Sequence, residues 1–323
     1  MSKRFKNPYI EKLKRTPKDF LYLLLGKYKE SCIPKAPPPH FCYPEPESKG
    51  SAGEYTVTWI NHSTFLIKAG GFTFLTDPIY AEWAGPFPFL GPRRRHPPGI
   101  LLDDLPPIDF VLLSHNHYDH MCKETIYELV RRFPAICWIV PRNLEKWFAA
   151  RNIGRVTALN WWETKEFDEF PENEKIRITA TPAQHNSGRG IFDVNKTLWM
   201  GIVVEIEKEG VKKTVYFVGD TAYNPYDFKD IGNRIRPIDL CLCPIGTYKP
   251  DTFMRTVHSS PADAVKIHKD VNAALSIGMH WKTFKLSFEH MEEPPYDLFL
   301  EMKRQNLDPR HFIAVDPGLE VCW

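Results

Sequence analysis

The sequence has no long hydrophobic run. A helix needs roughly 18–20 consecutive apolar residues to cross a bilayer, and the longest early run, Phe20–Leu25, has only six. This run is also shorter than the core of a secretory signal peptide, and it begins too far along the chain. We therefore expect no transmembrane segment and an intracellular protein, either cytoplasmic or peripheral to a membrane.

Cysteine pairing patterns are also missing. The chain has seven cysteines, an odd number, and none of them lies in Cys-x-x-Cys or zinc-ribbon spacing. Cys241 and Cys243 lie in an apolar run, where buried thiols are more common than a bridge. The cysteine content therefore predicts a reducing compartment.

The net charge is small but unevenly distributed. Residues 1–30 carry nine Lys or Arg and three Asp or Glu, a balance of +6, which leaves 33 basic and 37 acidic residues elsewhere, a balance of −4. A negative folded part argues against a nucleic-acid hydrolase. Two interpretations of the basic, partly apolar arm are open: it lies on an anionic membrane surface, or it is a mobile tail or a helix docked on the domain.

Composition divides the chain into two parts. Residues 1–53 form a basic N-terminal arm followed by a linker or extended cover strand rich in Pro, Gly, Ser and Glu. Residues 54–323 form one folded domain. Apolar runs of strand length alternate there with helical patterns, including a helix over 142–151 and a strand over 198–206, which indicates a layered α/β arrangement.

Residues 79–104 show no regular period. Aromatic residues come first, and Arg93, Arg94 and Arg95 follow. A loop of this length in a compact domain is usually functional. Aromatic side chains beside arginines suit a lipid phosphate, although the same loop could simply cap the core.

Four candidate metal ligands are crowded into six residues, His115, His117, Asp119 and His120, directly after the apolar run Phe110–Leu113. His115 and His117 are two residues apart, so they point to the same side of extended chain. Asp119 and His120 follow where the chain must turn, so each pair can hold one ion. Imidazole and carboxylate without thiolate suit zinc in an open, catalytic site.

The pattern His-x-His-x-Asp-His resembles the signature of the metallo-β-lactamase superfamily. The surrounding sequence resembles more narrowly the branch of phospholipases D that hydrolyse N-acylphosphatidylethanolamine, and the resemblance runs from about Trp59 to Phe312. The matching segments are Leu105–Asp109, Ser114–His120, Thr76–Ile79, Gly91–Arg94, Asp220–Thr221, Pro244–Gly246 and Ile277–Trp281. The resemblance implies an αββα sandwich with a single catalytic domain and metal ions at the edge shared by its two halves.

The resemblance also implies roles for individual residues. Three histidines, His115, His117 and His185, would hold the first zinc ion, and Asp119, His120 and His280 would hold the second. Asp220 would bridge the two ions beside a shared hydroxide. Asp119, Asp220 and His258 would be catalytic, with His258 donating a hydrogen bond or proton, unless it only caps the following helix. Asp77 would support a ligand histidine, or form a turn before Pro78.

The implied function is a zinc-dependent phosphodiesterase that converts N-acyl phosphatidylethanolamine to phosphatidic acid and N-acylethanolamine. The alternative is a dinuclear-metal hydrolase of a soluble ester such as a sugar-phosphate lactone, because the metal motif does not determine the substrate. The expected partners are the phospholipid and a peripheral membrane surface, with no nucleic acid. A homodimer is left open.

Overall fold

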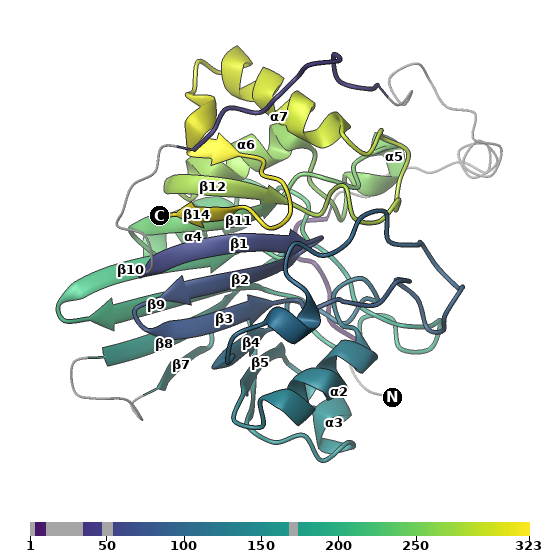
Figure 1. Cartoon of the computed structure of the whole chain (residues 1–323), viewed down its shortest axis with the longest axis vertical. Coiled ribbons are helices and arrows are strands. Elements are labelled where there is room, and N and C mark those ends of the chain that lie inside the picture. Colours follow the sequence, from purple (N-terminus) through teal and green to yellow (C-terminus); the bar gives the residue numbers. More distant parts are fainter. Residues whose placement is uncertain (1–3, 11–34, 47–53, 168–173) are drawn as a thin grey trace.

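The computed structural model describes residues 4–10, 35–46, 54–167 and 174–323. Two seven-stranded mixed sheets lie face to face, with helices on their outer sides (Figure 1). The first sheet has the order β14-β1-β2-β3-β4-β5-β6 and the second has the order β13-β12-β11-β10-β9-β8-β7. This is the αββα sandwich that the resemblance implies.

The first sheet is formed by β1 (Tyr55–Asn61), β2 (Thr64–Ala69), β3 (Phe72–Thr76), β4 (Phe110–Leu112), β5 (Cys137–Pro141), β6 (Val156–Leu159) and β14 (Glu320–Cys322). The second is formed by β7 (Thr164–Phe167), β8 (Glu174–Thr181), β9 (Gly201–Lys208), β10 (Val211–Phe217), β11 (Ile238–Pro244), β12 (Ala273–Met279) and β13 (Phe312–Ile313). The α-helices are α2 (Lys123–Arg132), α3 (Glu145–Ala149), α4 (Asp227–Arg234), α5 (Asp251–Met254), α6 (Pro261–Asp270) and α7 (Glu293–Arg304).

Both faces of the first sheet are buried. Along β3 and β4, alternate side chains go to two different apolar clusters. Phe74 and Phe110 belong to the core between the sheets, whereas Leu75 and Val111 belong to the cluster shared with α2 and α3. Because successive strand residues point to opposite faces, a strand buried on both sides reads as a continuous apolar run. This explains the run before the histidine motif.

Some predicted elements differ from the structure. The helix expected over residues 142–151 is only Glu145–Ala149, because Arg142 and Asn143 form a turn. The Arg142 amide donates to the carbonyl of Leu159 in β6, and the Asn143 side chain donates to the Lys196 carbonyl. The strand expected from residue 198 begins at Gly201. Strand β7 was not predicted, because its first three residues are exposed and polar.

The parts of the N-terminal region that the structure describes have no regular element. Residues 35–46 run over α7, where Phe41 packs on Phe299 with ring centroids 5.5 Å apart and Tyr43 Oη donates to the Phe312 carbonyl. Residues 35–46 contain no helix or strand. The apolar run Phe20–Leu25 lies outside the described residues. Within the described ranges, no helix is long and apolar enough to cross a membrane.

Candidate metal centre

Polar side chains from both sheets meet at one edge of the sandwich. They follow the carboxyl ends of five strands, and one precedes α6. In chain order they are Asp77 after β3, His115, His117, Asp119 and His120 after β4, His185 after β8, Asp220 after β10, His258 before α6, and His280 after β12. The structure therefore brings together every residue that the sequence predicts for the site.

The first group consists of His115, His117 and His185. His115 Nε2 lies 2.8 Å and His185 Nε2 lies 3.2 Å from His117 Nδ1, so three ring nitrogens face one another. The outer ring nitrogens are fixed, since His115 Nδ1 donates to Ser114 Oγ (2.9 Å) and His185 Nδ1 donates to the Val257 carbonyl (2.7 Å). Such bonds set the tautomer that leaves Nε2 free for a metal ion.

The second group is built in the same way. The Nε2 atoms of His120 and His280 lie 3.5 and 3.6 Å from Asp119 Oδ2. His120 Nδ1 donates to Asp77 Oδ2 (2.7 Å) and His280 Nδ1 donates to Thr247 Oγ1 (3.1 Å). Among the described residues, neither Nε2 atom makes a well-oriented hydrogen bond although both are buried. Both nitrogens face carboxylate oxygens instead, an arrangement that fits ligands of one metal ion.

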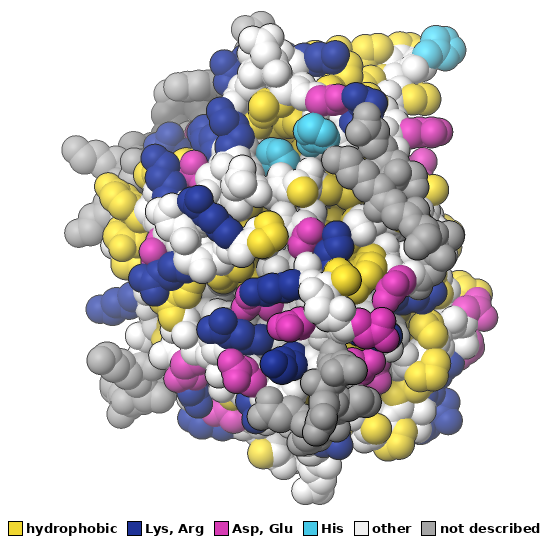
Figure 2. Space-filling model, turned by 90° about the vertical axis from the view of Figure 1, so that its left-hand side faces the viewer, with side chains coloured by type: hydrophobic (Ala, Val, Ile, Leu, Met, Phe, Trp, Pro, Cys, Tyr) yellow, Lys and Arg dark blue, Asp and Glu magenta, His cyan; other side chains and the backbone are white. Residues whose placement is uncertain are grey.

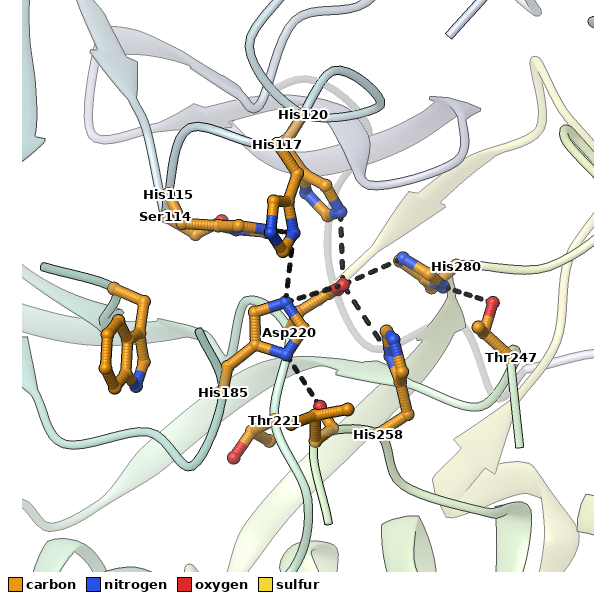
Figure 3. Close-up of polar contacts among 12 residues, drawn as sticks. Ser114, His115, His117, His120, His185, Asp220, Thr221, Thr247, His258 and His280 are labelled. Atoms are coloured by element: carbon orange, nitrogen blue, oxygen red, sulfur yellow. Dashed lines mark hydrogen bonds and ion pairs between the residues drawn. The ribbon is translucent and has the colours of Figure 1, made fainter. Parts of the chain in front are cut away.

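Asp220 lies between the two groups. Figure 3 shows four imidazole rings directed at one of its carboxylate oxygens. The distances to Asp220 Oδ2 are 3.3 Å from His120 Nε2, 3.7 Å from His185 Nε2, 3.0 Å from His280 Nε2 and 3.7 Å from His258 Nδ1. Its other oxygen, Oδ1, is buried without a partner in the described chain. A carboxylate in this position can contact an ion in either group.

The charges of the site suit divalent cations. Burial lowers the pKa of His115 and His185 well below the usual value, which keeps both imidazoles neutral. Burial alone would raise the pKa of Asp220, but the neighbouring histidines outweigh it and lower that pKa strongly. For His280, burial is outweighed by Asp220 and Asp119, which raise its pKa to about 9. A proton and a metal ion compete for that nitrogen.

Three residues at this edge have strained backbone. Asp77, Thr247 and His280 have positive φ angles of 29°, 65° and 66°. Non-glycine residues in this region persist where surrounding structure forces them, often at functional sites. Gly219, at φ 66°, leaves room beside Asp220, because a Cβ atom there would lie 2.8 Å from Ser114 Cβ.

His62 is a site residue that was not predicted. It lies in the β1–β2 turn, is almost fully buried, and its Nε2 is 3.0 Å from Asp119 Oδ2. Its ring centroid is 4.1 Å from that of His280. A signal was available in the sequence, because Gly70-Gly71 between two strand-length runs favours a hairpin, and that hairpin places this turn next to Asp77.

The structure also bears on two open alternatives. Asp77 lies behind His120 and accepts hydrogen bonds from Ser114 N (2.7 Å) and Ser114 Oγ (2.5 Å), so it supports a candidate ligand rather than only forming a turn. The cap of α6 is Ser260, whose hydroxyl accepts from the Asp263 amide. His258 is therefore not that cap, and its ring faces Asp220 (Figure 3).

Two arginines of the 79–104 loop have partners inside the loop. Arg93 pairs with Glu82 (2.6 Å). Arg94 donates to the carbonyls of Ile79 and Ala81 and lies over the Phe284 ring. Both side chains thus anchor the loop, whereas Phe87 and Phe89 in the same loop are exposed.

Comparisons with known proteins agree with this geometry. A family model described as a beta-lactamase superfamily domain matches residues 73–281. The chain belongs to the metallo-β-lactamase superfamily. It is 39% identical to N-acyl-phosphatidylethanolamine-hydrolyzing phospholipase D 1 of Caenorhabditis elegans over 269 residues. The aligned segment covers 81% of this chain and 74% of the relative.

A second relative carries a similar name. The mitochondrial N-acyl-phosphatidylethanolamine-hydrolyzing phospholipase D of Saccharomyces cerevisiae is 33% identical over 249 residues, 77% of this chain and 52% of the relative. Among solved structures, a metallo hydrolase of Ignicoccus hospitalis superposes with a TM-score of 0.59 at 20% identity over 83% of this chain and 97% of that one. This superfamily member is a hydrolase whose site has the donors of a metal centre.

Proposed function

We propose that the chain is a zinc-dependent phosphodiesterase of phospholipase D type that hydrolyses N-acyl phosphatidylethanolamine to phosphatidic acid and N-acylethanolamine. The observation that carries the proposal is the 39% identity to a relative named for this reaction, over a segment long enough to include the site. The donor set supports it, since imidazoles and carboxylates without thiolates suit catalytic zinc.

His115, His117 and His185 would hold one ion, Asp119, His120 and His280 the other, and Asp220 would contact both. Two zinc ions supply a water molecule of lowered pKa and neutralise charge on the phosphate. Burial lowers the pKa of His258 to about 4, so this imidazole is neutral near pH 7. We assign it the role of hydrogen-bond donor to a phosphate oxygen.

Exposed apolar side chains support a phospholipid substrate. They lie on three loops that follow the site-bearing strands β3, β8 and β10. We call them the apolar rim, and its members are Phe87, Phe89, Leu90, Ile191, Phe192 and Tyr226. Phe89 and Phe192 are 82% and 79% exposed. Exposed apolar groups on loops that also carry site residues suit a binding surface. We propose that this rim lies against the phospholipid surface from which substrate is taken.

The opposite edge of the sandwich has a different character. Figure 2 shows it from the side of the β9–β10 hairpin, where Lys or Arg and Asp or Glu side chains are interspersed. Many of them are paired, as in the contact between Lys212 Nζ and Glu205 Oε1 at 2.7 Å. A mixed, ion-paired surface suits solvent. The contrast favours the apolar rim as the face turned to lipid.

Product analysis tests the reaction. Zinc-loaded protein is incubated with N-acyl phosphatidylethanolamine in mixed micelles containing H₂¹⁸O, and the products are identified by mass spectrometry. We expect phosphatidic acid carrying one ¹⁸O atom together with N-acylethanolamine, and neither product from Asp220→Asn. Absence of both products from wild-type protein with bound metal would refute the lipid reaction. Hydrolysis of a soluble phosphodiester by that preparation would then favour the alternative.

Vesicle binding tests the apolar rim. Phe192→Asp should weaken co-sedimentation with phosphatidylethanolamine vesicles about tenfold while turnover of a soluble phosphodiester is unchanged. Val211→Asp is the matched control, because Val211 is an exposed apolar residue at the far hairpin, 49% accessible. Equal effects of the two substitutions would contradict the assignment of the rim to the membrane.

A further inference from the structure

The backbone of His185 has an unusual partner. His185 follows β8 at the point where the chain leaves the sheet, so its amide and carbonyl have no neighbouring strand. Both groups bond to the side chain of Asn7, since Asn7 Nδ2 donates to the His185 carbonyl (2.7 Å) and the His185 amide donates to Asn7 Oδ1 (3.2 Å). The two residues are 178 positions apart.

The carboxamide of Asn7 thus imitates a neighbouring strand. A carboxamide has a donor and an acceptor side by side, which matches the amide and carbonyl of a single residue. His185 is 1% exposed, and among the described residues no other group bonds to its backbone amide or carbonyl. Buried backbone groups are almost always paired. Asn7 supplies the two backbone hydrogen bonds that no neighbouring strand provides to His185.

Residues 4–10 are held in place on both sides of this contact. The Phe5 amide donates to the Asn195 carbonyl (2.9 Å), on the loop that follows His185. The Tyr9 ring packs on Tyr226, with centroids 4.6 Å apart, on the segment that follows Asp220. We call residues 4–10 the strap. It spans two loops that begin at residues of the metal centre, and Asn7 lies at its middle.

We propose that Asn7 is a positioning residue of the metal centre. It fixes the backbone of His185, while the Val257 carbonyl fixes the ring through Nδ1 at 2.7 Å. With backbone and ring both held, Nε2 faces His117 and Asp220 (Figure 3). This inference rests on the proposed role of His185 as a ligand of the first ion. It also means that the strap contributes to the site as well as to any membrane contact of the arm.

The experiment compares Asn7→Ala and Asn7→Asp with wild-type full-length protein. Aspartate has the same shape as asparagine but lacks the donor for the His185 carbonyl. Lys6→Ala is the matched control, because Lys6 is an exposed residue of the same strap. The first measurement is hydrogen–deuterium exchange of the peptide containing His185 in metal-free protein. We expect faster exchange in Asn7→Ala and unchanged exchange in Lys6→Ala.

The second measurement is metal affinity, from Co²⁺ titration against a chromophoric chelator. Loss of a residue that orients a ligand commonly weakens metal affinity about 10- to 100-fold. We expect a loss of about tenfold for one of two equivalents in Asn7→Ala and Asn7→Asp, by analogy with such residues. For bis(p-nitrophenyl) phosphate, kcat should fall while KM stays within twofold.

Several results would overturn the proposal. Unchanged exchange in Asn7→Ala would show that the contact does not order His185. Faster exchange with wild-type metal affinity would limit Asn7 to a structural role, and equal losses in Lys6→Ala would make the effect unspecific. The Co²⁺ titration involves no phospholipid, so it stands even where the proposed lipid reaction fails.

Discussion

Removing the carboxylate of Asp77 should weaken metal binding by the second group of side chains more than by the first. Asp77 is fully buried and accepts three hydrogen bonds, from the Ser114 amide, from Ser114 Oγ and from His120 Nδ1. In Asp77→Asn the amide group can accept only at one atom, and its NH₂ group would face a donor. The His120 ring would then change tautomer and present N–H, instead of a lone pair, to the ion.

The magnitude follows from these contacts. Substitution of groups that orient metal ligands lowers metal affinity about 10- to 100-fold, which is about 1.4–2.7 kcal/mol. Asp77→Ala would in addition leave three donors unpaired, and we expect a loss of roughly 3–5 kcal/mol in unfolding free energy, as for a broken buried pair. The first metal group, which Asp77 touches only through Ser114, should bind with affinity closer to that of wild type.

The assay is isothermal titration of metal-free protein with Zn²⁺, accompanied by urea unfolding. Asp103→Asn is the control, because Asp103 is an exposed aspartate paired with Arg132 at 3.0 Å, and exposed pairs contribute only about 0–1 kcal/mol. We expect one of two equivalents to weaken in Asp77→Asn and neither in Asp103→Asn. Two equivalents of wild-type affinity in Asp77→Asn would refute the reasoning about the tautomer.

Three further outcomes are expected. His62→Asn, which removes the 3.0 Å contact to Asp119, should lower the affinity of one Zn²⁺ equivalent about tenfold. A Zn²⁺ titration identical to that of wild-type protein would contradict a role of His62 in metal binding. His258→Ala should lower kcat for a soluble phosphodiester about 100-fold with two metal equivalents retained, as checked by elemental analysis. Burial lowers the pKa of His268 from 6.5 to about 4. Between these two pH values the unfolded chain binds a proton at this residue and the folded chain does not. The free energy of unfolding therefore falls by up to about 1.4 kcal/mol per pH unit as pH drops below 6.5. In metal-free protein His268→Asn, which can keep the bond to Ser276, should make the urea-unfolding slope between pH 7 and pH 5 shallower, because only the contribution of His268 is removed.

The part of the site that was predicted is the part that is local in sequence. His115, His117, Asp119 and His120 fall within six residues after a buried strand, so a short extended segment and the turn that follows it bring their side chains to one edge. A layered α/β arrangement was predicted from strand-length apolar runs that alternate with helical patterns, whereas the αββα sandwich came from the resemblance. The positions of His185, Asp220 and His280 came instead from the resemblance.

The unpredicted residues depend on tertiary structure. His62 reaches Asp119 across 57 positions, and Asn7 reaches His185 across 178. A lone histidine in a turn and a lone asparagine in a basic arm have no periodicity that points to a partner. Strand β7 was missed for a different reason, because an edge strand with an exposed start lacks the apolar alternation on which the prediction depends.

The origin of the donors links metal binding to the stability of the whole domain. In the first group, His115 and His117 follow a strand of the first sheet, whereas His185 follows a strand of the second. In the second group, His120 and His280 divide in the same way. An ion held by either group would therefore join the two sheets. Binding only to the folded chain adds about 4 kcal/mol at a free concentration 1,000 times the Kd, comparable to a large part of an ordinary domain's stability of roughly 5–15 kcal/mol. Asp77 and Asn7, which bond to His120 and His185, would therefore stabilise the packing of the two sheets as well as orient the groups proposed to bind metal.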